Sequence, residues 1–145
     1  MVRPLTIGAE GGQRVAWRAG VQTRLRAREA AELCVIEQWS VPGAGAPTHT
    51  HHEVEEVIAV LGGVAEFWVD GVTRRVDGGE VIVLPAKSWH GFRNAGTTEL
   101  HTLAVFSAAR PPVVYEDDPE TVLEIGGAGA PFDAHRSYRA DGGIT

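Results

Sequence analysis

The sequence predicts a single all-β domain, folded as a sandwich or a closed barrel. Eighteen glycines and eight prolines in 145 residues fall between short apolar runs, which is the spacing of strands joined by tight turns. No segment has the length and period of a long helix, which argues against a sheet built with crossover helices. The expected strands span residues 14–17, 21–27, 33–41, 47–51, 56–61, 64–69, 72–76, 80–84, 90–93 and 100–106.

Local turn signals divide these strands. The dipeptide Asp70-Gly71 lies between two β-rich runs and predicts a type I′ hairpin. Taking Val69 opposite Val72 then sets Glu66 opposite Arg75, which we expect to form an exposed ion pair.

Two short segments are open to a helical interpretation. Residues 27–32 have helical propensity, but they are few, and we expect a turn. Asp118 followed by Pro119 predicts one short helical turn through Leu123, with Asp118 as N-cap and Pro119 at the first helical position.

Composition excludes several classes of function. A net charge of −6 offers no footprint for nucleic acid or for an anionic membrane. The single Cys34 excludes an internal disulfide, and we expect it to be a small buried hydrophobe. Residues 1–12 lack a signal-peptide pattern, and no apolar stretch is long enough to span a bilayer. We therefore expect a cytoplasmic protein.

Candidate metal ligands occur in two separate segments. Residues 49–56 read His-Thr-His-His-Glu-Val-Glu-Glu, and His90 follows 34 residues after Glu56. Residues two apart on a strand share a face, so His49 and His51 project together. Glu56 can join them only if the chain turns between, and His90 must enter from a second hairpin. Three imidazoles and one carboxylate are typical ligands of a mononuclear transition metal.

The spacing of these residues resembles that of the cupins, which are small β-barrels marked by two motifs. The first motif, G-x5-H-x-H-x(3,4)-E-x6-G, is matched by Gly43, His49, His51, Glu56 and Gly63.

The second motif, G-x5-P-x-G-x2-H-x3-N, is matched by Gly79, Pro85, His90 and Asn94. Lys87 stands where the family has glycine. That glycine usually serves a positive φ, so the turn is expected to differ locally, and Lys87 itself is expected to be a solvated loop residue rather than one at the rim of the pocket.

The resemblance implies a double-stranded β-helix, or jelly-roll barrel, with the metal inside. His49, His51, Glu56 and His90 align with the family's metal ligands. Glu55 is the rival of Glu56, because the first motif also tolerates three residues of spacing. Glu56 is preferred because Gly63 then falls as in most members. A surface histidine cluster and a cupin whose site stays empty are the competing interpretations.

Such a site suits a divalent Fe, Mn, Ni, Co, Cu or Zn ion and is too rich in nitrogen for Ca or Mg. Four protein ligands leave open positions for a substrate oxygen, water or dioxygen. The resemblance implies a dioxygenase-type oxidoreductase acting on an oxygen-rich aromatic substrate, with Glu56 also serving as proton acceptor. A non-oxidative isomerase, lyase or cyclase and a non-catalytic binding protein are the alternatives.

The remaining expectations concern the flanks and the pocket. The core barrel is expected at residues 14–108, with 109–145 as a tail that wraps the barrel, covers its mouth or crosses to a second subunit of a homodimer. His101 is expected to make an ordinary hydrogen bond rather than to line the pocket. Glu37 and Trp39 share a strand face, so they point inward together or outward together. His52 is expected to face solvent or to support the ligands without binding the metal itself, and His135 has no assigned role.

Overall fold

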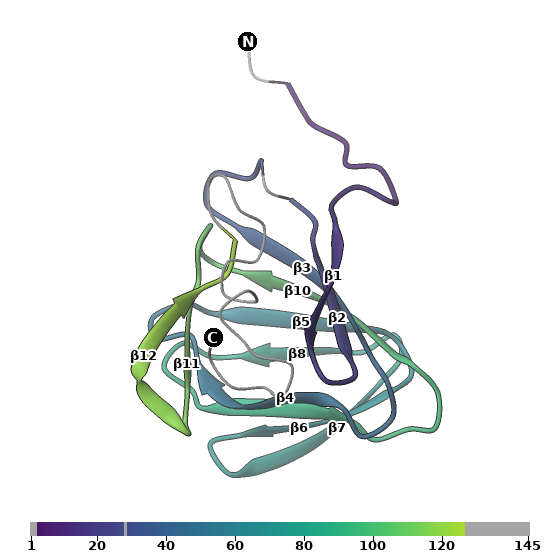
Figure 1. Ribbon diagram of the computed structural model, residues 1–145, viewed down its shortest axis with the longest axis vertical. Coiled ribbons are helices and arrows are strands. Elements are labelled where there is room, and N and C mark those ends of the chain that lie inside the picture. Colours follow the sequence, from purple (N-terminus) through teal and green to yellow (C-terminus); the bar gives the residue numbers. More distant parts are fainter. Residues whose placement is uncertain (1–2, 28, 127–145) are drawn as a thin grey trace.

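Two six-stranded antiparallel sheets form the protein. The computed structural model describes residues 3–27 and 29–126. The first sheet has the order β1-β2-β3-β10-β5-β8, and the second has the order β12-β11-β4-β9-β6-β7. In Figure 1 the hairpin β11–β12 stands at one side of the barrel, beside the stacked strands of the first sheet.

The strands of the first sheet are β1 (Arg14–Arg18), β2 (Val21–Leu25), β3 (Cys34–Ser40), β10 (Leu100–Phe106), β5 (Glu56–Gly62) and β8 (Val81–Leu84). Those of the second sheet are β12 (Asp118–Glu124), β11 (Pro112–Tyr115), β4 (Gly45–Thr50), β9 (His90–Asn94), β6 (Val64–Val69) and β7 (Val72–Asp77).

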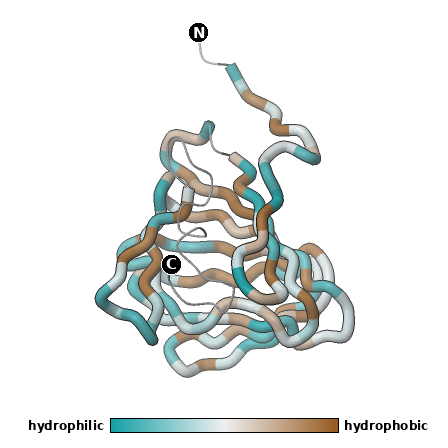
Figure 2. The backbone as a smooth tube through the Cα atoms, viewed as in Figure 1, coloured by the Kyte–Doolittle hydropathy of each residue, from teal (hydrophilic) through white to brown (hydrophobic). Residues whose placement is uncertain are grey.

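The core lies between the sheets and follows from the alternation of side chains along each strand. In β10, every second residue from Leu100 to Phe106 is buried, and the residues between are only partly covered. Figure 2 shows the same alternation as short hydrophobic and hydrophilic segments along the tube. Phe67, Phe92 and Phe106 are each at most 4% exposed and come from both sheets. Burial of a large apolar side chain stabilises a fold by about 1.5–3 kcal/mol, so this shared interior holds the sheets together.

The all-β prediction is confirmed, and the Asp70-Gly71 turn has the expected geometry. Asp70 has φ of 46° and Gly71 has φ of 82°, and a type I′ turn requires positive φ at both positions. The predicted register is also correct, with Glu66 opposite Arg75.

The ion pair predicted from that register is wrong. Glu66 accepts a hydrogen bond from Arg93 at 3.0 Å, and Arg75 pairs with Asp77 at 2.9 Å. The reason is that β6 lies between β7 and β9, which places Arg93 in register with Glu66 on the other side.

The helical turn predicted at residues 118–123 is also wrong, because these residues form β12. Tyr115 pairs with Asp118 across a two-residue turn, and Val113 pairs with Leu123. The backbone hydrogen bonds between β11 and β12 outweigh the preference of Pro119 for the first turn of a helix. Since β12 is the edge strand of its sheet, the missing N–H of Pro119 is tolerated there. Residues 127–145 of the predicted tail, including His135, lie outside the described residues.

Within residues 3–27 and 29–126, no helix has the length and hydrophobicity that crossing a membrane requires.

Candidate metal centre

The structure brings His49, His51, Glu56 and His90 together inside the barrel. One candidate ligand atom from each residue lies within 4.8 Å of the others, and all four residues are buried. Glu56 Oε1 is 3.3 Å from His51 Nε2 and 3.2 Å from His90 Nε2. The imidazole ring centroids of His49 and His90 are 4.6 Å apart.

Both sheets supply this cluster. His49 lies on β4 directly opposite His90 at the start of β9, and His51 follows just after β4. The chain then reverses through His52, which has a positive φ of 53°, and the Val54 amide donates to the His51 carbonyl at 3.1 Å. This turn carries Glu56 onto β5 of the opposite sheet, so the carboxylate faces the imidazoles across the interior.

Backbone carbonyls orient two of the imidazoles. His49 Nδ1 lies 2.6 Å from the Pro47 carbonyl oxygen, and His51 Nδ1 lies 2.8 Å from the Pro112 carbonyl oxygen. A carbonyl only accepts, so the hydrogen is assigned to Nδ1 and the lone pair to Nε2. This is the arrangement by which proteins commonly fix metal-binding histidines.

Ser88 orients the third imidazole. Its hydroxyl donates to the Pro85 carbonyl at 2.6 Å and lies 3.3 Å from His90 Nδ1. Because its hydrogen is donated to Pro85, the hydroxyl accepts a hydrogen bond from His90 Nδ1–H. The lone pair of His90 then lies on Nε2, where it can bind a metal.

Three atoms at the centre lack hydrogen bonds. His51 Nε2, His90 Nε2 and Glu56 Oε1 are fully buried, and none makes a hydrogen bond of good geometry to any described residue. Buried polar atoms are rarely left in this state, because they have lost water without gaining a partner. A divalent transition metal bound among them would satisfy all three, so the donor set fits such an ion.

The protonation states agree with metal binding. Burial first, and then the charges of His90 and His51, hold the pKa of His49 well below its ordinary value. Burial acts to raise the pKa of Glu56, but the electrostatic influence of His51 and His90, which lie beside the carboxylate, outweighs it and lowers that pKa. A neutral imidazole and an ionised carboxylate are the forms that ligate a metal.

The cluster opens into a cavity with about 460 Å³ of empty space, part of it open to solvent. Apolar side chains form most of the wall. Among the described residues that line it, the only ionisable side chains besides Tyr115 are Glu56 and the three histidines, and none is a lysine or an arginine. The lining residues are Trp17, Ile36, Gln38, Ala46, His49, His51, Glu56, Ile58, His90, Phe92, Phe106, Val113, Tyr115 and Ile125.

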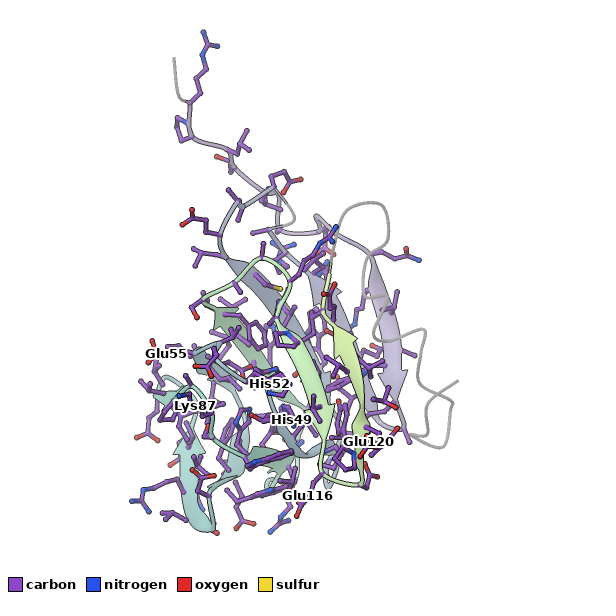
Figure 3. The ribbon with its side chains drawn as sticks, turned by 90° about the vertical axis from the view of Figure 1, so that its left-hand side faces the viewer. His49, His52, Glu55, Lys87, Glu116 and Glu120 are labelled. Atoms are coloured by element: carbon purple, nitrogen blue, oxygen red, sulfur yellow. The ribbon has the colours of Figure 1, made fainter. Side chains whose placement is uncertain are left out.

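Glu55, the rival of Glu56, does not belong to this cluster. Its backbone amide donates to Ser107 Oγ at 3.0 Å, and its side chain is exposed. In Figure 3, Glu55 and Lys87 lie toward the edge of the molecule, while His49 lies within the barrel.

Lys87 is an exposed loop residue with an unusual backbone. Its φ is 67°, the left-handed conformation for which the family's glycine is suited. The Lys87 amide donates to the His52 carbonyl at 2.6 Å, and its ammonium lies 3.6 Å from Glu53. These contacts join the two loops that carry the candidate ligands.

Glu37, Trp39 and His101 lie on the outer face of the first sheet. His101 Nε2 is 2.5 Å from Glu37 Oε2, and the His101 ring stacks on Trp39 with centroids 5.2 Å apart. None of the three lines the cavity. The expectation of an ordinary hydrogen bond for His101 is therefore met.

Several residues near the centre were not anticipated from the sequence. Tyr115 on β11 packs against His49 with ring centroids 5.4 Å apart, and Gln38 and Trp17 line the cavity. The run Pro-Val-Val-Tyr at 112–115 was the available signal for β11, since it is rich in strand-forming residues.

Comparison with known proteins places this architecture in a class. The protein is a small double-sheet β-barrel with a potential metal site of three histidines and one glutamate. A family model described as the cupin domain matches residues 40–106, so this region of the chain is a cupin domain. A comparison with curated protein sequences finds no significant match.

Solved structures share the fold at low sequence identity. KdgF from Halomonas sp. has a TM-score of 0.64 and 20% identity, covering 70% of this chain and 93% of that one. An RmlC-like cupin from Shewanella frigidimarina NCIMB 400 has a TM-score of 0.62 and 22% identity, covering 70% of this chain and 87% of that one. A predicted oxalate decarboxylase from Thermotoga maritima has a TM-score of 0.62 and 20% identity, covering 72% of this chain and 99% of that one.

Proposed function

We propose that the protein is a metal-dependent oxidoreductase of dioxygenase type that acts on a small, oxygen-rich aromatic substrate. His49, His51, Glu56 and His90 would hold one divalent transition-metal ion. The observation that carries this proposal is the convergence of four buried ligand atoms, three of them without hydrogen bonds, at the wall of a largely apolar cavity. Such an ion, when bound, acts as a Lewis acid and, if redox-active, gives access to dioxygen chemistry.

The chain's own residues have separate tasks in this proposal. The carbonyls of Pro47 and Pro112 hold His49 and His51 in one tautomer. Glu56 is a buried, ionised carboxylate among the candidate ligands, so it is the group that would accept the proton of a substrate hydroxyl. The apolar wall favours the flat face of an aromatic ring.

Metal analysis followed by oxygen uptake tests this function. We expect purified protein to carry close to one transition-metal ion per chain, and the loaded protein to consume oxygen with a catechol or a flavonol. His90→Ala should remove both the metal and the oxygen uptake. A protein that carries a redox-active metal but consumes no oxygen with either substrate class would contradict the proposal.

A lyase activity on the same barrel is the second candidate. It is favoured by the similarity to the predicted oxalate decarboxylase, a likeness that concerns the fold. Turnover that is equal with and without air would select this candidate. Oxalate itself is a direct test, and we expect weak binding because no lysine or arginine of the described residues lines the cavity.

A homodimer is proposed from the outer face of the first sheet. Val35, Val105, Val57 and Val83 form a continuous row across four strands, and Val83 is 55% exposed. An extended apolar face is uncommon on a monomer, and a two-fold axis would bury the same face of both copies. Light scattering of wild type and of Val83→Glu would measure the assembly. A cytoplasmic location stays a prediction.

A further inference from the structure

Gln38 is a buried amide in the wall of the cavity. It lies in the middle of β3 with its side chain on the inner face, and it is 5% exposed. Its side chain makes no hydrogen bond to any of the described residues. An amide that lines a cavity without a protein partner is free to form hydrogen bonds with a ligand bound there.

The strand register gives the distance between Gln38 and the candidate metal centre. Phe106 on β10 is opposite both Cys34 and Glu56, while Thr102 is opposite both Gln38 and Val60. Gln38 is therefore four residues along the sheet from the level of Glu56. At roughly 3.3 Å per residue, the two levels are about 13 Å apart at the backbone, and side chains reaching inward shorten the gap.

A row of apolar side chains lies between the row that contains Glu56 and the row that contains Gln38. Ile36, Ala104 and Ile58 lie in register between them and are all at most 4% exposed. A ligand that spans the cavity would meet metal-binding atoms at one end, an apolar belt in the middle and the Gln38 amide at the other end.

The far end is polar but uncharged. Thr23 pairs with Gln38 on one side and Thr102 pairs with it on the other, and the buried Thr23 Oγ1 makes no hydrogen bond to a described residue. No arginine or lysine of the described residues lines the cavity. A neutral amide both donates and accepts, so it suits a hydroxyl or carbonyl, whereas a carboxylate buried there would be costly.

We propose that Gln38 is a specificity-determining residue that recognises a neutral hydroxyl or carbonyl group at the end of the substrate remote from the metal. The substrate class is thus an elongated molecule that reaches from the candidate metal centre to Gln38, with metal-binding oxygens at one end and an uncharged oxygen at the other. This inference rests on the proposed metal site and aromatic substrate, and it does not depend on turnover.

A matched set of three rigid ligands tests it. The probes are biphenyl-3,4-diol, its 4′-hydroxy derivative and its 4′-carboxylate, titrated anaerobically into zinc-loaded protein, since zinc does not change oxidation state. Wild type should bind the 4′-hydroxy probe about tenfold more tightly than the plain diol, the gain typical of one good buried hydrogen bond. Gln38→Leu should abolish that ratio and leave the affinity for the plain diol within about twofold. The control is Gln22→Leu, which removes an exposed amide from the outer face of β2 and should keep the wild-type ratio.

The possible results separate this inference from the proposed function. An unchanged ratio in Gln38→Leu would overturn the role of Gln38, and so would a failure of all three probes to bind. Tightest binding of the carboxylate would also overturn it, because an uncharged amide in a site without basic side chains does not favour an anion. A ratio lost in Gln38→Leu, in a protein that never consumes oxygen, would keep the inference and reject the dioxygenase.

Discussion

His51 Nδ1 lies 2.8 Å from the carbonyl oxygen of Pro112, a residue 61 positions further along the chain. Pro112 begins β11, which lies beyond the region 40–106 that matches the family. The same strand places Tyr115 against His49. The candidate metal centre is thus completed by a segment outside the motifs that mark it.

His51→Ala should weaken metal binding strongly. It removes one of four candidate ligands and leaves Glu56 without one of the two imidazoles beside it. Even hydrogen-bond partners of metal ligands are worth about 10–100-fold in affinity, so we expect a loss greater than about 100-fold. Elemental analysis after dialysis measures it. His52→Asn is the matched control, since His52 is exposed and asparagine tolerates its φ of 53°, and equal metal content in the two variants would reject the ligand set.

Ser88→Ala should weaken metal binding by about tenfold without unfolding the protein. The substitution removes the acceptor that holds the His90 imidazole by Nδ1, while His90 itself remains. Competition with a chelator of known affinity provides the measurement, and the exposed Thr73→Ala is the control. An affinity equal to that of wild type would show that Ser88 does not orient His90.

Lys87→Gly should stabilise the protein relative to Lys87→Ala by about 1 kcal/mol, because only glycine adopts a φ of 67° without steric cost. Both variants lose the ion pair with Glu53, in which the side chains are 73% and 78% exposed, so that loss cancels in the comparison. Chemical denaturation of the two variants gives the difference. A less stable glycine variant would mean that the turn gains nothing from relief of strain.

Cys34 should resist alkylation in the folded protein. Burial, assisted by the charge of Glu56, raises the pKa of its thiol to about 12, and the residue is 1% exposed. At pH 8 the reactive thiolate is therefore scarce and covered. Iodoacetamide should label the thiol only after unfolding in denaturant, as read by mass spectrometry, and rapid labelling of the native protein would contradict this environment.

The features that the sequence could predict are those decided by neighbouring residues. Asp70-Gly71 determines its turn locally, and the two-residue period places the side chains of His49, on β4, and His51, just after it, on the same side. The choice between Glu55 and Glu56 depended on the turn at His52, whose left-handed backbone could not be read from spacing alone.

The remaining errors come from contacts between distant segments. Glu66 lies between two arginines, and only the place of β9 beside β6 decides that Arg93 is its partner. Likewise, β12 is a strand because β11 offers it a ladder, and β11 itself is held by pairing with β4. Local propensity at Asp118 and Pro119 carries no information about that pairing.

The division of the candidate ligands between the two sheets links metal occupancy to folding. Glu56 lies in one sheet, His49 and His90 lie in the other, and His51 follows β4, so an ion can be held by all four only while the sheets stay packed together. Unfolded chains would release it, and mass action then makes saturating metal a stabiliser, by about 4 kcal/mol at a free concentration 1,000 times the dissociation constant. Chelation would therefore lower the melting temperature, and a cell short of the ion would hold a less durable form of the protein.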